Sequence, residues 1–353
     1  MKKITSIFLL GWSFAMSMSF MSCSSDGNTT PVKNNIEATK TTKVIGEEGI
    51  SYAFTDLVFF DNQWFLTFRK SNKHASGENG KIQIYNSLDG EKWNFIKEFS
   101  VEGIDLRDPK FSLNGDKLFL YIHGSKYKDG KLIAFSDYNT IYTKELGFQG
   151  LQDVFLDNLK HDVANIDGNE AWPWRVTWYK GKAYTVGYGV SGIFDIYSSE
   201  DGNFFKNLNA FKNINGQPNE ATIRIDNNGE FFILARRLYG NTMVGRSFDT
   251  NSNWDWSNEI ELPNFGGPNF VFTKENRMIV SGRLWGWVSL TYYDLLNNKN
   301  TVVTSINSGG DCGYPGMVIQ GDYLWLSYYS SHENTLGSSI YVSKINLKQL
   351  GYN

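Results

Sequence analysis

The sequence comprises 353 residues, of which 41% are hydrophobic and 16% aromatic, and its formal net charge is −3. This composition supports a large apolar core, and the slightly negative charge argues against nucleic acid as a partner. The 2 cysteines are too few for a disulfide framework and the 4 histidines are scattered, so we expect neither a bound metal nor a cofactor.

The N-terminus has the anatomy of a bacterial secretion signal. Two lysines precede a short apolar stretch that ends near Phe20, and Cys23 directly follows a small residue. This order predicts a lipoprotein signal peptide over residues 1–22, with Cys23 as the lipidated first residue. The alternative is an ordinary signal peptide with a chance cysteine. Residues 23–38 are mostly polar and predict a tether, so acyl chains would hold a secreted domain at the cell envelope, on the periplasmic or surface face of the outer membrane.

The remaining residues, 39–353, show the punctuation of an all-β domain. Short aromatic or β-branched runs alternate with clusters of Gly, Asn and Asp, without a convincing amphipathic helix. Similar segments begin at three equally spaced positions, Ala221, Pro268 and Pro315. Looser copies of the same segment begin earlier in the chain, near Phe54, Asp108 and Trp174. Such a repeat predicts a β-propeller of six blades, with five or seven as alternatives. The last unit lacks one strand, which residues 41–45 are expected to supply.

A second repeated feature predicts tight turns between the third and fourth strands of a unit. It occurs at residues 87–93 and 199–205, and in a degraded form at residues 247–254. Ser and Asp side chains can close a turn onto its own backbone, while Gly supplies the positive φ. The feature resembles the Asp box (BNR repeat) of sialidases and related propellers, and we expect it to be structural.

Arginine side chains are predicted to gather at one mouth of the ring, where the first strand of each unit begins and the second ends. Six occupy such positions: Arg69, Arg107, Arg175, Arg236, Arg237 and Arg283. Converging guanidinium groups repel one another, so an anionic ligand explains them most simply, because the fork of Arg binds a carboxylate through two hydrogen bonds. The alternative is that some form structural ion pairs with Asp108, Glu170 or Glu220.

Other candidate site residues are predicted at the same mouth. Glu220 and Tyr314 stand at the start of first strands, and His74 follows the second strand of the first unit. Asp108 and Trp174 are candidate substrate contacts, since a carboxylate can accept hydrogen bonds from a sugar and an indole can stack on its ring. The alternatives are ordinary packing for the tryptophan and a surface role for the histidine.

The order of these residues resembles the sialidase superfamily. Sialidases carry a Glu before one inner strand, an Arg at the end of the next strand, a second such Arg in the following blade, and a Tyr before the last inner strand. Here Glu220, Arg236 or Arg237, Arg283 and Tyr314 follow that order. The resemblance implies that Tyr314 is the nucleophile and that Glu220 activates it. It also implies that the arginines bind the carboxylate of the substrate.

The first half of the chain departs from the sialidase pattern. The family has an Arg before its first inner strand, whereas residues 52–56 contain none. The family's acid/base Asp lies on the loop after the second strand, where this chain has His74 and, further on, Glu78. Arg107 and Arg175 are additional to the pattern. These differences indicate a different acidic glycan or a different bond.

We therefore expect a sialidase-like exo-glycosidase that acts as a monomer on an acidic sugar held by an arginine cluster. Two alternatives remain open. One is a non-catalytic glycan-binding lipoprotein. The other is a propeller-type polysaccharide lyase, with His74 or Tyr314 as base beside a uronate neutralised by arginine. Hydrolysis adds water, a lyase leaves an unsaturated sugar, and a binding protein leaves the glycan intact, so product analysis distinguishes the three.

Overall fold

The structure, a computed structural model, describes residues 35–74, 79–157, 167–189, 192–211, 214–250, 253–273, 277–300, 303–334 and 336–350. Contacts divide the chain into Met1–Val32 and a compact unit of Lys33–Asn353, to which all described residues belong. The described part of this unit is almost entirely β, and a 3₁₀ helix, η2 (Leu347–Leu350), follows its last strand. Cys23 lies outside the described residues. Within them, no helix combines the length and apolarity needed to cross a membrane.

Three of the sheets in the described ranges are four-stranded and antiparallel. One contains β2 (Ser51–Phe60), β3 (Gln63–Ser71), β4 (Lys81–Ser87) and β5 (Asn94–Phe99). Another contains β17 (Pro218–Ile225), β18 (Phe231–Arg237), β19 (Asn241–Ser247) and β20 (Asp255–Pro263). The third contains β26 (Cys312–Gln320), β27 (Tyr323–Ser330), β28 (Ser339–Asn346) and β1 (Lys40–Ile45). In the third sheet, β1 pairs antiparallel with β28, so a strand from the start of the unit completes a sheet formed by its end.

Two larger sheets contain the other strands. A five-stranded sheet contains β21 (Gly266–Phe272), β22 (Arg277–Leu284), β23 (Trp287–Asp294), β24 (Lys299–Asn300) and β25 (Thr304–Ser305). An eleven-stranded sheet contains β6 (Asp105–Asn114), β7 (Lys117–Lys128), β8 (Lys131–Thr143), β9 (Gly147–Phe148), β10 (Gln152–Leu156), β11 (Asp167–Gly168), β12 (Ala171–Pro173), β13 (Thr177–Tyr179), β14 (Lys182–Gly189), β15 (Phe194–Ser199) and β16 (Phe204–Asn207). The larger sheet is continuous because β10 pairs with both β8 and β16.

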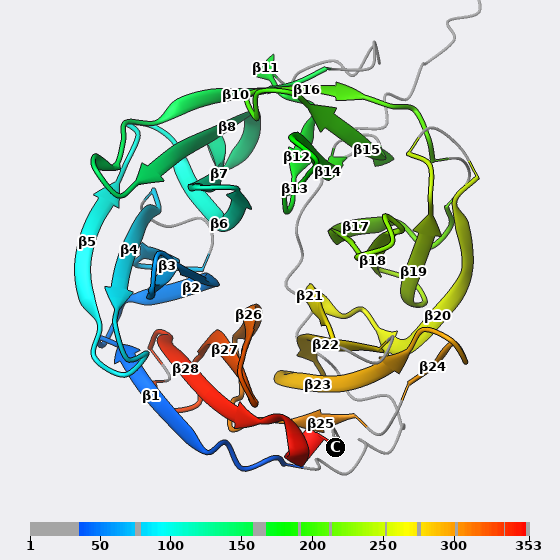
Figure 1. Ribbon diagram of the computed structural model, residues 1–353. Helices are drawn as coiled ribbons and strands as arrows, with labels where there is room; N and C mark the ends of the chain where they lie inside the picture. Colours follow the sequence, from blue (N-terminus) through cyan, green and yellow to red (C-terminus); the bar gives the residue numbers. More distant parts are fainter. Residues whose placement is uncertain are drawn as a thin grey trace, which may run out of the picture. The chain divides into compact units, whose positions relative to one another are not determined.

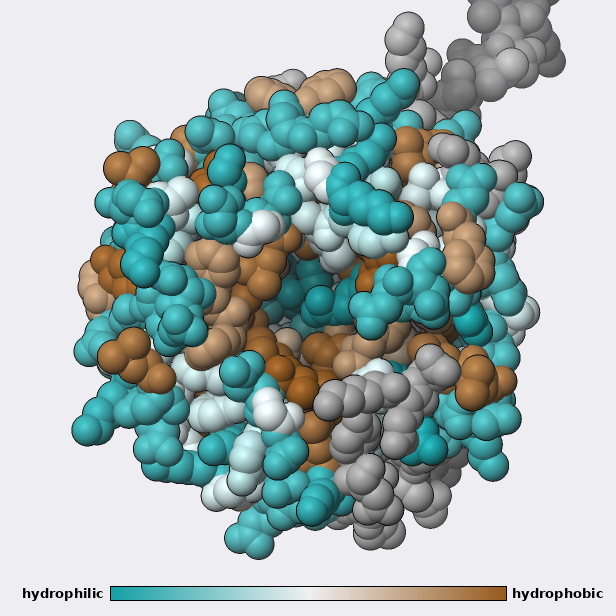
Figure 2. Space-filling view, viewed as in Figure 1, coloured by the Kyte–Doolittle hydropathy of each residue, from teal (hydrophilic) through white to brown (hydrophobic). Residues whose placement is uncertain are grey.

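The sheets are arranged around a central axis, with β2, β6, β12, β17, β21 and β26 innermost (Figure 1). Buried apolar clusters join strands of neighbouring sheets; one of them combines Ile279 and Leu290 with Leu324 and Leu326. Burial of such side chains is the main driving force for packing the sheets together. Figure 2 shows that the face turned to the viewer is hollowed near the centre, with hydrophilic surface at depth and hydrophobic surface beside it.

Five of the six innermost strands share a β-bulge near their start. The register with the second strand shifts within β2, β6, β17, β21 and β26. Bulge residues with positive φ are Phe54 (59°), Asp108 (44°), Gly267 (60°) and Tyr314 (52°). A bulge redirects a side chain out of the regular alternation of a strand, and positive φ is uncommon for residues other than glycine. The repeated bulge therefore directs a set of side chains away from the ladders.

The Ser–Asp turns close onto their own backbone. Ser87 Oγ accepts a hydrogen bond from the Gly90 amide (2.8 Å) and donates one to Asp89 Oδ1 (3.0 Å). Ser199 and Asp201 repeat this geometry. The backbone hydrogen bonds that Asp89 accepts lower the pKa of its carboxyl group to about 2. At the third copy Ser247 Oγ donates to the Asp249 carbonyl instead.

Candidate active site

The centre of the site is a hydrogen bond between Tyr314 on β26 and Glu220 on β17. The phenol donates to Glu220 Oε1 at 2.5 Å, and both residues are more than nine-tenths buried. The Gly267 amide, on the intervening strand β21, donates to Glu220 Oε2 at 2.6 Å. Both carboxylate oxygens are therefore held in place.

Gly267 lets the tyrosine ring lie directly against β21. A Cβ atom at this position would come within 2.6 Å of Tyr314 Cγ, which is closer than van der Waals contact permits. Its φ of 60° is also one that glycine adopts without strain. Glycine is thus required at this bulge so that Tyr314 can reach Glu220.

The surroundings fix the proton on the tyrosine. Burial would raise the pKa of the Glu220 carboxyl, but the positive charge of Arg236 and the hydrogen bonds from Tyr314 and Gly267 lower it below its ordinary value overall. Burial and the charge of Glu220 raise the pKa of the Tyr314 phenol well above 10, against the opposing charges of the arginines. At neutral pH the pair is a phenol that donates to a carboxylate.

Two arginines lie beside this pair. Arg236 Nη1 is 3.0 Å from Glu220 Oε1, and its Nε and Nη2 donate to Asn264 Oδ1 at 2.9 and 2.6 Å. The Arg283 guanidinium carbon lies 5.7 Å from the centre of the Tyr314 ring, and its Nη1 is 3.7 Å from Asp311 Oδ1. The Arg283 side chain is 29% exposed, against 14% for Arg236, so Arg283 offers the more accessible positive charge.

His74 joins the same cluster through Asp311. Its Nδ1 is 2.7 Å from Asp311 Oδ2, and its ring packs edge-on against Phe54, with 5.0 Å between the ring centres. Phe54 in turn packs edge-on against Tyr314 at 5.1 Å. The imidazole is therefore one aromatic ring away from the Tyr314 phenol.

Three more predicted residues line this region. The Arg107 guanidinium lies 5.0 Å from the centre of the Phe54 ring, and the Trp174 ring centre is 5.7 Å from that of Tyr314. Asp108 Oδ2 is 3.8 Å from Arg107 Nε, while its Oδ1 is buried and has no hydrogen-bond partner within the described ranges. Burial raises the pKa of Asp108, although the charges of Lys110 and Arg107 oppose it.

The other three predicted arginines are bound by groups of the protein. Arg69 is fully buried and donates to Asp105 Oδ1 (2.7 and 3.0 Å) and to the Lys73 carbonyl. Arg237 is held by Glu259, the Asn241 carbonyl and Asn215 Oδ1. Arg175 Nη1 contacts both carboxylate oxygens of Asp56 at 2.9 and 3.0 Å. Their contacts are those of structural ion pairs.

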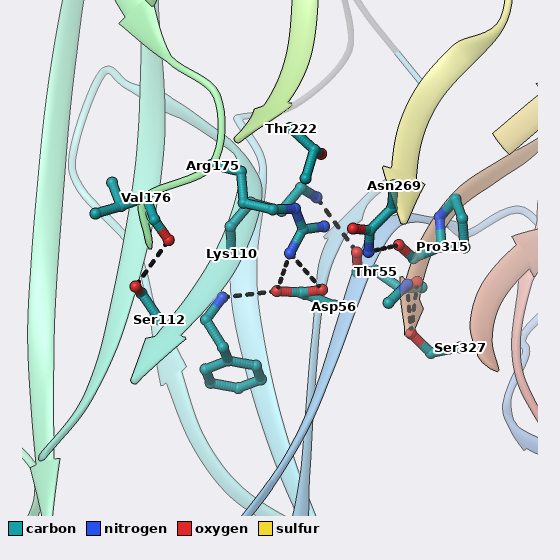
Figure 3. Close-up of polar contacts among 12 residues, drawn as sticks. Thr55, Asp56, Lys110, Ser112, Arg175, Val176, Thr222, Asn269, Pro315 and Ser327 are labelled. Carbon is teal, nitrogen blue, oxygen red and sulfur yellow. Dashed lines mark hydrogen bonds and ion pairs between the residues drawn. The ribbon is translucent and has the colours of Figure 1, made fainter. Parts of the chain in front are cut away.

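A buried polar layer links the inner strands next to the bulges (Figure 3). Thr55 Oγ1 donates to the Tyr314 carbonyl at 2.9 Å, and Asn269 Nδ2 donates to the Pro315 carbonyl at the same distance. Lys110 Nζ donates to the Thr55 carbonyl at 3.3 Å. Burial lowers the pKa of Lys110 to about 8. Side chains of one strand thus satisfy the backbone of the next and fix where Tyr314 sits.

Sequence reasoning did not single out Asp311, Asn264 or Phe54 as site residues. Asp311 had a signal, because it lies three positions before Tyr314 in a segment that enters the mouth. Phe54 had one as well, because it opens a repeat unit as Asp108 and Trp174 do. Asn264 had none, since its role depends on its contact with Arg236, 28 residues away in the chain. In the ranges that the structure covers, no group of three or more His, Cys, Asp or Glu side chains is placed to hold a metal ion.

Comparisons with known proteins identify a fold and no family. No family model matches the sequence, and no curated protein matches it. Similar solved structures include Trypanosoma rangeli sialidase in complex with sialic acid, with a TM-score of 0.67, 14% identity, and coverage of 91% of this chain and 59% of that one. Against another structure of that sialidase, this chain spans 54% of its length.

Two smaller proteins match over their full length. One is the Penicillium chrysogenum α-L-arabinanase complexed with arabinobiose (TM-score 0.60, 15% identity, 89% of this chain and 99% of that one). The other is the intramolecular trans-sialidase from Ruminococcus gnavus in complex with oseltamivir carboxylate (TM-score 0.61, 11% identity, 92% and 100%). At such identities the likeness is one of fold, and the chain has the β-propeller fold that these glycosidases share.

Proposed function

We propose that this protein is a glycoside hydrolase of sialidase-like type that removes an acidic sugar from the end of a glycan. The observation that carries the proposal is the 2.5 Å hydrogen bond from the Tyr314 phenol to Glu220, with Arg236 and Arg283 beside it. A phenol is a weak nucleophile unless a base accepts its proton, and Glu220 is placed to do so.

The arginines favour an acidic substrate over a neutral one. Arg283 is partly exposed, and its nearest carboxylate, Asp311, is 3.7 Å away, a distance that leaves its donors available to a ligand. A substrate carboxylate could bind Arg283 in the fork geometry and approach Arg236. Arg107 and Asp108 would contact the rest of the sugar, whereas Trp174, which is 2% exposed, would support the Tyr314 ring. The similar structures are complexes with sialic acid and with arabinobiose, and the arginines make a sugar acid the better match.

A hydrolysis screen tests the proposal. Residues 39–353 would be incubated with oligosaccharides that end in sialic acids, in uronic acids or in neutral sugars, and the products analysed by mass spectrometry and ultraviolet absorbance. Release of a hydrated acidic monosaccharide supports the proposal. An unsaturated product would show a lyase, and intact glycans that nevertheless bind would show a binding protein.

Arg283→Ala is expected to lower kcat/KM on the acidic substrate by about 10- to 100-fold, because a charge-assisted hydrogen bond contributes about 1.5–3 kcal/mol. Initial rates on the glycan found in the screen measure this. The matched control is Arg246→Ala, which removes an arginine that pairs with Glu230 outside this cluster. Equal losses in both variants would mean that Arg283 acts through stability and not through the substrate.

We further infer that residues 39–353 form one six-bladed domain. Support comes from the pairing of β1 with β28 and from the β10 pairings, which join two groups of four strands into the eleven-stranded sheet. The apolar clusters between successive groups of strands are consistent with this reading.

For localisation we propose that Cys23 carries a lipid anchor. Cys23→Ser is expected to move the protein from the membrane fraction to the soluble fraction of cells that express the full chain, because one cysteine would carry the whole anchor. Fractionation followed by immunoblotting measures this. Membrane association that persists in the variant would contradict the proposal.

A further inference from the structure

Hydrolysis through Tyr314 requires a second proton-transfer group. Glu220 takes the proton of the phenol, and both of its oxygens are already bound by Tyr314 and Gly267. The oxygen of the leaving sugar needs a proton from elsewhere, since an alkoxide is a poor leaving group. That donor must reach the side of the substrate away from Glu220.

We propose that His74 is this general acid and base, and that Asp311 is the residue that positions it. The inference rests on the proposed function. Its basis is the 2.7 Å contact between His74 Nδ1 and Asp311 Oδ2, together with the packing of the imidazole on Phe54 beside Tyr314. The His74 side chain is 25% exposed, so the imidazole is not sealed inside the protein.

Asp311 is itself firmly held, as a positioning residue must be. The Tyr329 phenol donates to its Oδ1 at 3.1 Å, and the Ser331 hydroxyl accepts from its backbone amide at 2.9 Å. Burial alone would raise the pKa of the Asp311 carboxyl, but the hydrogen bond and charge of His74 and the charge of Arg283 lower it overall. A fixed carboxylate beside Nδ1 keeps a proton on that nitrogen, so Nε2 is the nitrogen that exchanges a proton with the substrate.

The steps balance as a double displacement. In the first, Tyr314 Oη bonds to the anomeric carbon and passes its proton to Glu220, while the bond to the leaving oxygen breaks and that oxygen takes a proton from the His74 imidazolium. In the second, water attacks the anomeric carbon and gives a proton to neutral His74. The bond to Tyr314 breaks, and the phenolate recovers its proton from Glu220.

Leaving-group dependence tests the role of His74. His74→Ala is expected to lower kcat/KM by about 100- to 10,000-fold on an oligosaccharide of the sugar found in the screen. On the 4-nitrophenyl glycoside of that sugar, whose leaving group needs no proton, the loss should be at most about tenfold. Azide, which attacks without general-base help, should restore turnover of the aryl glycoside.

Nitrogen-15 NMR tests the role of Asp311 without any substrate. The chain has only 4 histidines, so the His74 signals can be assigned by their loss in His74→Ala. In the neutral ring we expect the proton on Nδ1 in the wild type and a shift toward the Nε2-protonated tautomer in Asp311→Ala. Asp311→Ala should also lower kcat/KM on the oligosaccharide at least about tenfold and leave kcat/KM on the aryl glycoside nearly unchanged. If that variant does not fold, Asp311→Asn takes its place.

The two proposals fail in different ways. A wild type that cleaves no glycan overturns the proposed function and the catalytic role of His74 with it. A second outcome is that the wild type cleaves the glycan and Tyr314→Phe does not, while His74→Ala lowers kcat/KM by the same factor on both substrates. In that case only the role of His74 is overturned. A neutral His74 ring that carries its proton on Nε2 alone in the wild type overturns the positioning by Asp311.

Discussion

Tyr314→Phe is expected to abolish hydrolysis, with a loss of at least about 1,000-fold on both aryl and oligosaccharide substrates, because the change removes the attacking oxygen. The fold should survive. The ring keeps its contacts with Phe54 and Trp174, and Glu220 keeps its bonds to Gly267 and Arg236. Loss of the phenolic hydrogen bond to a carboxylate should cost about 1.5–3 kcal/mol of stability.

Steady-state rates and circular dichroism of the variant measure the two effects separately. Glu220→Gln is the companion variant, since it keeps the shape of the side chain and removes the base. It should also lower turnover on both substrates. Full activity in Tyr314→Phe would place the nucleophile elsewhere, and His74 would become the leading residue to examine.

The pairing of Tyr314 with Glu220 was predictable because it follows from position within a repeat. Both residues stand at the start of an inner strand, and the bulge near this point recurs from strand to strand. Equal spacing in the sequence therefore carried over into equivalent places around the axis. The pairing distance was not predictable, because it depends on Gly267 in the strand between them.

The choice between Arg236 and Arg237 shows a limit of sequence reasoning. Successive side chains of a strand point to opposite faces, so only one of two adjacent arginines can face Glu220. Arg236 pairs with Glu220, and Arg237 pairs with Glu259 on β20. The alternation of side chains along a strand is general. Which of Arg236 and Arg237 faces inward depends on the register of β18, and the sequence did not determine that register.

The ion pairs of Arg69 and Arg175 show a second limit. Their partners, Asp105 and Asp56, lie in other sheets and far away in the chain, so no local pattern connects them. A position at the start or end of an inner strand indicated only that each arginine was near the central axis. Whether it met a ligand or a carboxylate depended on tertiary contacts. The same holds for the β10–β16 pairing, which no periodicity predicted.

Asp56→Ala is expected to lower the free energy of unfolding by about 3–5 kcal/mol, because removing one partner of a buried ion pair leaves an uncompensated charge. Asp56 is 1% exposed and Arg175 is 5% exposed. Asp56 also accepts a hydrogen bond from the Phe111 amide at 2.7 Å. The variant therefore leaves two buried donors, the Arg175 guanidinium and the Phe111 amide, without their acceptor in the polar layer of Figure 3.

Urea unfolding of the 39–353 domain measures this loss. Glu91→Ala is the matched control, because it breaks the exposed Lys40–Glu91 pair, and a change within about 1 kcal/mol is expected there. The double variant Asp56→Ala/Arg175→Met should be more stable than Asp56→Ala alone, since it removes the charge that the single change leaves buried. Equal losses in Asp56→Ala and Glu91→Ala would mean that the polar layer does not hold the inner strands. The position of Tyr314 would then depend on the bulge geometry of β26 alone.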